Sequence, residues 1–496
     1  MATTPEVSVA VREKYEPVIG LEVHVQLLTE SKIFCSCSTK FGAPPNTNVC
    51  PVCLGLPGAL PVLNRKAVEF AVLAAMALKC RVNETSIFAR KNYFYPDLPK
   101  GYQISQFDKP IAEFGSIEIP VAVGNSTEIK TIGITRLHME EDAGKSLHDG
   151  FPDALDKTGI DLNRSGTPLI EIVSEPDIAS PDEAYEYLTR LKEIILYTGV
   201  SDCNMEEGSL RCDANVSIRP RGQKQLGTKA EIKNVNSFRF IREALIYEIG
   251  RQIDVVESGG KVTQETRLYN SSEGKTYSMR SKEQAHDYRY FPEPDLLPLV
   301  VDAKWQSKIA ETLPELPESR RKRIVADYGI TEYDAQILTA SKALADQFEA
   351  AAKAAKNPKR VANLVQSELA GRLKAKGLEI EHSPISMQGV AMSADLVESG
   401  AISGKMLKDL YDLCFERGKD FPAVYEEEGS PQQSTDTSAL EKIADELIAA
   451  NPKQVEQYRA GKKTVIGFFV GQLMKASKGQ GNPKLINELL EKKLGG

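Results

Sequence analysis

Acidic side chains and a histidine gather in one short segment, Arg136-Leu-His-Met-Glu-Glu-Asp-Ala-Gly-Lys145. Three adjacent carboxylates repel one another unless cations or solvent screen them. An isolated acidic run is usually a solvated turn, but this one follows a strand-like run at 132–136, and a second such cluster occupies 205–215. Oxygen ligands from separate segments suit Mg²⁺, which commonly accompanies phosphates. The pattern therefore indicates a pocket for metal-assisted phosphoryl transfer.

Two further segments carry polar groups of the same kind. The run 18–27 alternates, so Glu22 and His24 share the face opposite to its apolar residues. A solvated strand face would explain a lone histidine, but a Glu-x-His pair in a chain with acid clusters favours a metal-ligand role. Glu171 is the one charge in the apolar run 169–173, where a carboxylate is costly unless paired or metal-bound. We expect all three in one pocket.

Four of the eight cysteines lie close together in the sequence. Cys35 and Cys37 are followed, after twelve residues, by Cys50 and Cys53. Paired cysteines across a Gly- and Pro-containing loop can close a tetrahedral thiolate site for Zn²⁺, which would be structural because its coordination sphere is full. The alternative is four free thiols in a reducing compartment.

Lys91 lies in the aromatic and basic segment 90–103, which its turn-forming residues mark as an ordered loop. This lysine could reach a phosphate. The alternative is a surface lysine beside a packed aromatic cluster.

Composition and sequence patterns limit the possible folds. The 496 residues are 41% hydrophobic and 26% charged, typical of a soluble globular protein with several domains. The net charge of −7 means that any nucleic acid must meet a local basic surface. We find no apolar run long enough for a membrane span and no signal or transit peptide. Strand-like alternation nearly disappears after about residue 298, which predicts an α+β body followed by helical domains, with a break at 426–437.

Several motifs together resemble the B subunit of the aspartyl/glutamyl-tRNA amidotransferase, the GatB family. They are Ile19-Gly-Leu-Glu-Val-His-Val25, Arg90-Lys-Asn-Tyr-Phe-Tyr-Pro96, Tyr102-Gln-Ile-Ser-Gln-Phe107, Arg136-Leu-His-Met-Glu-Glu-Asp-Ala-Gly144, Met205-Glu-Glu-Gly-Ser-Leu-Arg-Cys-Asp-Ala-Asn215 and Asp287-Tyr-Arg-Tyr-Phe-Pro-Glu-Pro-Asp295. The resemblance covers nearly the whole chain. In the tail, Gly467-Phe-Phe-Val-Gly-Gln-Leu-Met-Lys475 and Asn482-Pro483 resemble the family's terminal YqeY-like motif.

The resemblance implies an architecture and a reaction. A mixed α/β "cradle" would occupy residues 1–298 with the inserted four-cysteine zinc site, an all-helical domain 299–425, and a tRNA-binding, YqeY-like helical tail 426–496. The implied enzyme is a cytoplasmic, heterotrimeric ligase of the EC 6.3.5 class. It uses ATP and Mg²⁺ to phosphorylate the side-chain carboxylate of Glu-tRNA(Gln), and in many organisms of Asp-tRNA(Asn). Ammonia from a glutaminase A subunit then forms the amide, and a small C subunit wraps the A–B interface.

Carried over residue by residue, the resemblance also implies a site. The metal ligands would be Glu22, His24, Glu141, Glu171 and Asp213, with Lys91 near the phosphates. Glu140, Glu206 and Glu207 are weaker candidates because adjacent acids cannot all point inward from an extended strand.

The chain departs from the family in two places, and two other functions compete. Many members lack the four cysteines, so zinc would be a structural staple here, and Lys478-Gly-Gln-Gly-Asn-Pro483 has lost one positive charge of the tail motif. No Ser-Ser-Lys amidase signature occurs, which places the glutaminase on another chain.

One alternative function is a stand-alone ATP-dependent kinase or ligase that acts on a small carboxylic acid. Basic clusters such as 320–323 count against this alternative. The other is a zinc-containing tRNA-binding scaffold, which would leave the acid clusters without a purpose.

Overall fold

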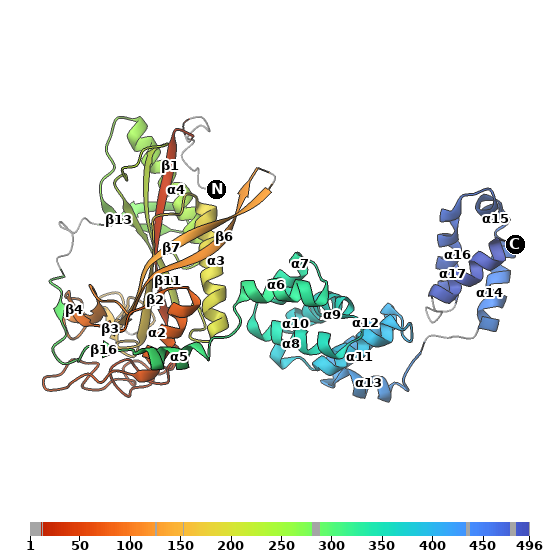
Figure 1. Cartoon of the computed structure of the whole chain (residues 1–496), viewed down its shortest axis with the longest axis horizontal. Coiled ribbons are helices and arrows are strands. Elements are labelled where there is room, and N and C mark those ends of the chain that lie inside the picture. The colour runs from red at the N-terminus through yellow and green to blue at the C-terminus, as the bar shows by residue number, and fades with distance from the viewer. Residues whose placement is uncertain are drawn as a thin grey trace. The chain divides into compact units, whose positions relative to one another are not determined.

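The structure is a computed structural model that describes residues 11, 13–124, 126–151, 153–279, 288–432, 437–476 and 483–495. The chain forms two compact units, Met1–Leu316 and Pro317–Gly496 (Figure 1). Helix α5 (Ala303–Ala310) belongs to the first unit, because Ile309 is buried in that unit's core and Arg65 lies over the ring of Trp305. The first unit thus continues beyond residue 298, and the division into three domains stays a prediction.

A nine-stranded mixed sheet is the centre of the first unit, in the order β14-β13-β12-β11-β1-β10-β7-β6-β2. In chain order the strands are β1 (Tyr15–Gln26), β2 (Arg81–Val82), β6 (Ala112–Val123), β7 (Ser126–Glu141), β10 (Pro168–Ser174), β11 (Leu210–Pro220), β12 (Ala230–Lys233), β13 (Glu265–Asn270) and β14 (Lys275–Ser278). Among the strands that the structure describes, only β12 and β13 pair in parallel. The long central strand β1 lies between β10 and β11, so its polar face is flanked on both sides.

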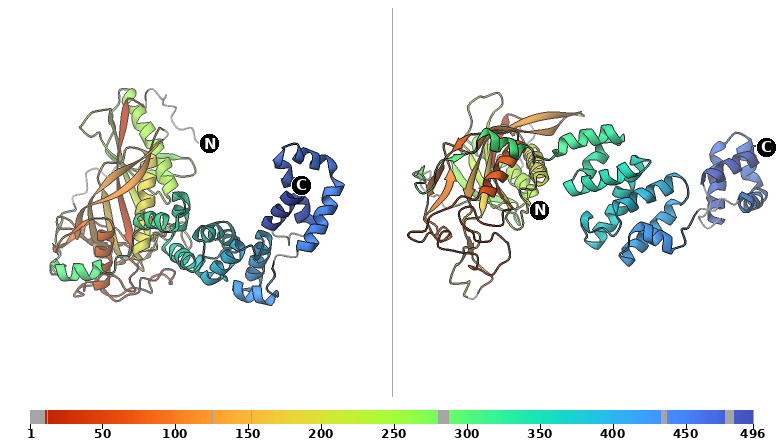
Figure 2. Two further views of the ribbon diagram at one scale, coloured as in Figure 1. Left: turned by 45° about the vertical axis from the view of Figure 1, so that its right-hand side comes forward. Right: turned by 60° about the horizontal axis from the view of Figure 1, so that its bottom comes forward.

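Three helices cover one face of this sheet (Figures 1 and 2). They are α2 (Arg65–Ala77), α3 (Pro181–Thr198) and α4 (Phe238–Glu257). The side chain of Ser180 accepts a hydrogen bond from the Glu183 amide at the start of α3, and Gly199, at φ +69°, ends it. The alternating residues Leu21, Val23 and Val25 of β1 belong to the core under these helices. The polar residues between them therefore face the other side of the sheet.

Small sheets stand at the polar side and the edges of the body. The three-stranded sheet β15-β4-β5 consists of β15 (Phe291–Pro292), β4 (Phe88–Asn92) and β5 (Tyr102–Gln106). Its strand β5 contacts the end of β7, through a hydrogen bond from Gln103 Nε2 to the Glu141 carbonyl. Two-stranded sheets pair β3 (Thr85–Ser86) with β16 (Leu299–Val300), and β8 (Lys145–Leu147) with β9 (Gly159–Asp161).

In the described part of the second unit every regular element is helical. Its α-helices are α6 (Pro317–Tyr328), α7 (Glu332–Leu338), α8 (Lys342–Ala354), α9 (Pro358–Leu364), α10 (Ala370–Lys376), α11 (Met387–Glu398), α12 (Gly404–Arg417), α13 (Phe421–Glu427), α14 (Thr437–Ala450), α15 (Pro452–Arg459), α16 (Ile466–Ala476) and α17 (Pro483–Leu494). The helices up to α13 and those from α14 onward have separate apolar cores. The predicted α+β class, with a mixed body and helical C-terminal region, is confirmed.

The basic cluster 320–323 does not form a free cationic surface. Arg320 is buried and donates to Asp346 and Glu349, at 2.6 and 2.7 Å. Arg323 also donates to Glu349, at 2.8 Å. The cluster therefore joins α6 to α8, because two of its guanidinium groups are used in ion pairs between the helices.

Among the described residues, no helix is both long and apolar enough to cross a membrane.

Candidate active site and cysteine cluster

Four adjacent strands place one polar residue each in a single row across the sheet. Arg211 on β11 is the register partner of His24 on β1, and Glu171 on β10 is the partner of both His24 and His138 on β7. Residues directly opposite on neighbouring strands share a face and lie about 5 Å apart. Strand pairing alone thus brings together residues more than a hundred positions apart in the sequence.

Three side chains on this face form what we call the acid–histidine cluster: His24, Glu140 and Glu171. One ligand atom from each lies within 4.8 Å of the other two. Nε2 of His24 is 3.4 Å from Oε2 of Glu171 and 3.5 Å from Oε1 of Glu140. Both carboxylates are buried. Two carboxylates and one imidazole at this spacing fit a small divalent cation.

A second histidine, His138, holds the two carboxylates from the side. Its Nε2 is 3.2 Å from Oε2 of Glu171 and 3.8 Å from Oε2 of Glu140. Nδ1 accepts a hydrogen bond from Arg136 Nε at 3.4 Å, so Nε2 carries the hydrogen in the neutral ring. Ser105 Oγ donates to Glu140 at 3.3 Å. The acid–histidine cluster is thereby oriented by buried polar neighbours.

The charges of this cluster stabilise one another. Burial opposes ionisation of Glu171, but the two histidines hold its pKa well below the ordinary value. Burial likewise disfavours the imidazolium of His138, yet Glu171 and Glu140 raise its pKa to about 9. Burial opposes the charge of His24 as well, but the hydrogen bond to Glu171 and the charges of Glu171 and Glu140 together raise its pKa. Burial also opposes ionisation of Glu140, but the hydrogen bond from His138 and the nearby cations lower its pKa. Both carboxylates are therefore anionic at neutral pH, as metal ligands must be.

Glu22 and Asp213 occupy the next row on the same face, where they are register partners. Asn215 Nδ2 donates to Glu22 at 3.0 Å, and Lys233 Nζ donates to Asp213 at 2.6 Å. Burial and then the charge of Glu171 raise the pKa of Glu22. These two acids flank the cluster, but they are not among the residues whose ligand atoms converge on one point.

Glu141 lies on the opposite face of β7, contrary to the expectation that it joins His24 and Glu171. Its Oε1 accepts hydrogen bonds from Lys100 Nζ and, at 2.8 Å, from the Ile104 amide. It lines a separate cavity of about 230 Å³ that also touches Cys53. Glu140, the weaker candidate in the sequence, takes its place in the cluster. The other two weak candidates, Glu206 and Glu207, are exposed on a turn.

A β-bulge explains the exchange of Glu141 for Glu140. The register between β10 and β7 shifts after Val173, so that Thr135 is left without a direct partner. Ile132 and Ile134 are core residues before the bulge, whereas Leu137 and Met139 are core residues after it. An extra residue in one strand reverses which positions face the core. Strict alternation from Ile134 would have turned Glu141, not Glu140, toward the polar face.

Lys91 on β4 lies beside the acid–histidine cluster. Burial disfavours its charge, yet Glu140 and, more weakly, Glu171 raise its pKa. Its Nζ is 5.0 Å from the centre of the Tyr288 ring. The lysine is thus cationic and close to both acids, where a phosphate bound at the cluster would meet it.

Two residues of this face, His138 and Arg211, were not predicted from the sequence. His138 lies two positions before Glu140, and Arg211 lies two positions before Asp213. In an extended strand this spacing places each pair on one face, which is the signal that could have found them.

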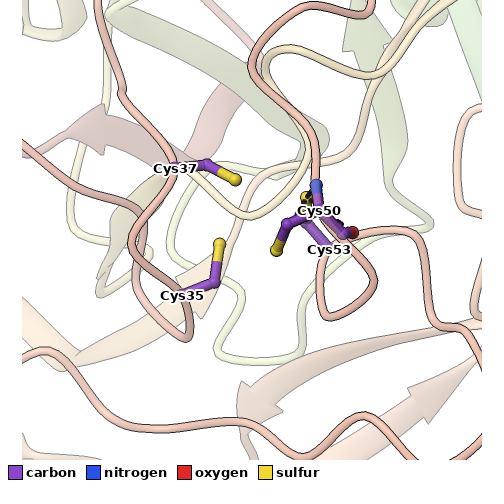
Figure 3. Close-up of side chains that lie close together, drawn as sticks. All are labelled: Cys35, Cys37, Cys50 and Cys53. Atoms are coloured by element: carbon purple, nitrogen blue, oxygen red, sulfur yellow. Dashed lines mark hydrogen bonds between the residues drawn. The ribbon is translucent and has the colours of Figure 1, made fainter.

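The four cysteines converge on one space (Figure 3). Their sulfur atoms all lie within 4.8 Å of one another, and Sγ of Cys50 and Cys53 are 3.9 Å apart. A tetrahedral site with metal–sulfur bonds of about 2.3 Å places its sulfurs about 3.8 Å apart. A hydrogen bond from Cys35, together with the charge of the buried Lys32, lowers the pKa of Cys53 to about 4. These four residues could hold one thiophilic metal ion.

Comparison with known proteins defines the class and then the family. Residues 17–307 match the GatB/GatE catalytic domain, and residues 346–494 match the GatB domain of the YqeY type. Similar relatives are named as the B subunit of aspartyl/glutamyl-tRNA(Asn/Gln) amidotransferase. The protein of Carboxydothermus hydrogenoformans is 56% identical over 97% of this chain and 99% of its own. That of Geobacter sulfurreducens is 54% identical over 97% of this chain and 100% of its own. The chain therefore belongs to the family of aspartyl/glutamyl-tRNA(Asn/Gln) amidotransferase B subunits, as its motifs predict.

Proposed function

We propose that this chain phosphorylates the side-chain carboxylate of glutamate on tRNA(Gln), with ATP as the donor, as a first step toward Gln-tRNA(Gln). Aspartate on tRNA(Asn) is the second substrate where the organism makes it. The observation that carries the proposal is the acid–histidine cluster of His24, Glu140 and Glu171 beside the cationic Lys91. The names of the relatives supply the aminoacyl-tRNA substrates.

The chemistry explains why such a site is needed. A carboxylate is a poor acyl donor because its oxygen is a poor leaving group. In the proposed step a carboxylate oxygen attacks the γ-phosphorus of ATP, the bond to the bridging oxygen breaks, and ADP leaves. Ammonia then attacks the acyl carbon, loses a proton, and displaces phosphate with the electron pair of the C–O bond. Phosphoryl transfer of this kind depends on alignment and charge neutralisation.

The residues divide this work among them. His24, Glu140 and Glu171 would hold Mg²⁺, which when bound offsets phosphate charge and aligns the reacting oxygens. Lys91 provides a fixed positive charge for the phosphates. His138 keeps both carboxylates oriented through its Nε2 hydrogen.

The neighbouring acids extend this site. Glu22 and Asp213 lie one row away on the same face of the sheet, where they would hold water of the metal ion or a second cation. The cavity beside Glu141 would be a separate region of the cradle.

Further parts of the proposal follow the family. The four cysteines would bind a structural Zn²⁺, since the sulfur spacing suits it and no ligand position is left open. A glutaminase A subunit would supply ammonia, and a small C subunit would complete a cytoplasmic heterotrimer. The helical domain and the tail would divide at about residue 425, with the tail binding tRNA. The motif 478–483 lies largely outside the described residues.

Assay of the assembled three-subunit complex tests the proposal. Wild type should form Gln-tRNA(Gln) only with ATP and Mg²⁺, and His24→Ala should abolish this reaction. Glutamine hydrolysis by the A subunit should persist at least in part, because its catalytic residues lie elsewhere. Loss of glutaminase activity with phosphorylation intact would instead make His24 a subunit-contact residue. Equal phosphorylation of free glutamate would favour a kinase of small carboxylic acids, and tRNA binding without ATP turnover would favour a scaffold.

A further inference from the structure

Five aromatic side chains form a continuous cluster outside the apolar core of the body, which we call the aromatic cluster. Its members come from three segments, which follow β4, follow β5 and precede β15, and they are Tyr93, Tyr95, Phe107, Tyr288 and Tyr290. The centres of neighbouring rings are 4.1–6.1 Å apart. Phe107 and Tyr290 are stacked with an interplanar angle of 8°. None of the five belongs to the buried core of the described body.

Much of this aromatic surface is accessible. Phe107 is 53% exposed and Tyr95 is 46% exposed. The three rings between them, Tyr93, Tyr288 and Tyr290, are half-buried. Apolar groups gathered at a surface mark a binding site more often than isolated ones do. The segment that carries Tyr288 is held against the end of β4, because the amide and side chain of Asn92 each donate a hydrogen bond to the Tyr288 carbonyl at 3.0 Å. A set of rings that is fixed by hydrogen bonds and exposed at its two ends has the features of a preformed binding surface.

The aromatic cluster and the acid–histidine cluster share Lys91 as a common neighbour. The lysine amine is 5.0 Å from the Tyr288 ring centre, and the charge of Glu140 raises its pKa against the effect of burial. Burial and then the charge of Glu140 raise the pKa of Tyr290, despite the opposing charge of Lys91. A ligand with phosphates at Lys91 would therefore carry whatever is attached to those phosphates toward the aromatic rings.

We propose that the aromatic cluster stacks an adenine base. The inference rests on the proposed function, in which both substrates carry this base close to a phosphate. ATP carries it on its triphosphate, and charged tRNA carries it on the 3′-terminal adenosine that bears the amino acid. Either face of an aromatic ring can stack on a flat base, and a neighbouring cation attracts the phosphates attached to that base. Burial of the same rings against a partner protein is the competing outcome.

Steady-state titration of the assembled complex tests the stacking. Phe107→Leu and Tyr290→Leu remove a ring, whereas Phe107→Tyr and Tyr290→Phe retain one. Each leucine variant should raise the KM of one adenine-bearing substrate roughly tenfold, with kcat changed less than the KM. The ring-retaining variants should stay within about twofold of wild type. Phe41→Leu, at an exposed phenylalanine outside the cluster, is the matched control.

Two outcomes of this titration identify which substrate supplies the base. A rise in the KM of ATP alone assigns it to the nucleotide. A rise in the KM of Glu-tRNA(Gln) alone, with weaker inhibition by a non-hydrolysable 3′-glutamyl-adenosine, assigns it to the terminal adenosine. Unchanged values for both substrates in both leucine variants would overturn the stacking, as would failure of these variants to assemble with the other subunits. A wild-type complex without ATP-dependent amidation would refute the proposed function instead.

Discussion

Glu140 and Glu141 are neighbours in the chain, but their carboxylates lie on opposite faces of β7. Glu140 converges with His24 and Glu171, whereas Glu141 is bonded to Lys100. We expect Glu140→Gln to slow ATP-dependent phosphorylation by roughly 10²–10⁴, the usual effect of losing a ligand to a phosphate-bridging metal. Titration of the complex with Mn²⁺ as the probe should show weakened binding. Glu141→Gln is the matched control, and equal loss of Mn²⁺ affinity in that variant would contradict this assignment.

His138 offers a second test at the scale of single residues. Its Nε2 hydrogen faces Glu171 and Glu140, so its loss should loosen both ligands. His138→Leu should weaken Mn²⁺ binding by about 10- to 100-fold, as is typical when a group that orients metal ligands is lost. His138→Gln retains an amide donor and should recover part of the affinity. If glutamine and leucine have the same effect, the histidine only fills space.

The cysteine loop can be tested as an element. The wild-type chain should contain one zinc ion, and Cys50→Ser should lose it, because three thiolates cannot close the site. The variant should unfold at a lower temperature yet keep part of its amidation activity, since the cysteines are not part of the acid–histidine cluster. Metal analysis and thermal unfolding check both points. A metal-free wild-type chain of undiminished stability would refute the zinc assignment.

The contact between α6 and α8 has a defined pH dependence. Burial raises the pKa of Glu349, but Arg323 and Arg320 lower it overall below its ordinary value. A carboxyl group with a lowered folded-state pKa contributes stability above its unfolded pKa of about 4.3, and this contribution is lost as the pH falls through the folded value. Glu349→Gln should therefore cost about 2 kcal/mol of unfolding free energy at pH 7 and progressively less below about pH 4.

Urea unfolding of the full chain at pH 7 and at acid pH measures this difference. Glu318→Gln is the control, because its partner Lys322 on the same helix is exposed and such a pair contributes little. A cost for Glu349→Gln that stays constant across this pH range would show that packing, rather than charge, holds the two helices together.

At the scale of the whole molecule, the tail can be removed as a unit. Helices α14–α17 have an apolar core of their own, which includes Leu440, Phe469 and Leu490. Deleting residues from about 430 onward should leave the other two cores intact and raise the KM for charged tRNA. Because phosphate contacts depend on salt, the truncated complex should also show a shallower decline of tRNA affinity with salt. Unchanged affinity and salt dependence would exclude the tail as a tRNA clamp.

The sequence by itself determined the features that depend on local spacing. The alternation of β1 places Glu22 and His24 on one face, and the short Cys-x-Cys and Cys-x-x-Cys pairs bring the sulfurs together. The N-cap Ser180 and the glycine Gly199 delimit α3 through local cap chemistry. The motifs also identified the family. Apart from the family motifs, which are spread over the chain, each of these features is decided within about twenty residues, where strand and helix periodicity and turn chemistry act directly.

Tertiary structure alone decided which of two adjacent acids joins the histidine. The bulge at Thr135 reverses the faces of β7, and it is defined by pairing with β10, more than thirty residues further along the chain. The same holds for Arg320, whose buried guanidinium is paired with Glu349 of α8. Residues 93 and 288 become neighbours through the pairing of β4 with β15. In each case the orientation of a side chain depends on a hydrogen bond or an ion pair with a distant segment, and local periodicity carries no information about that partner.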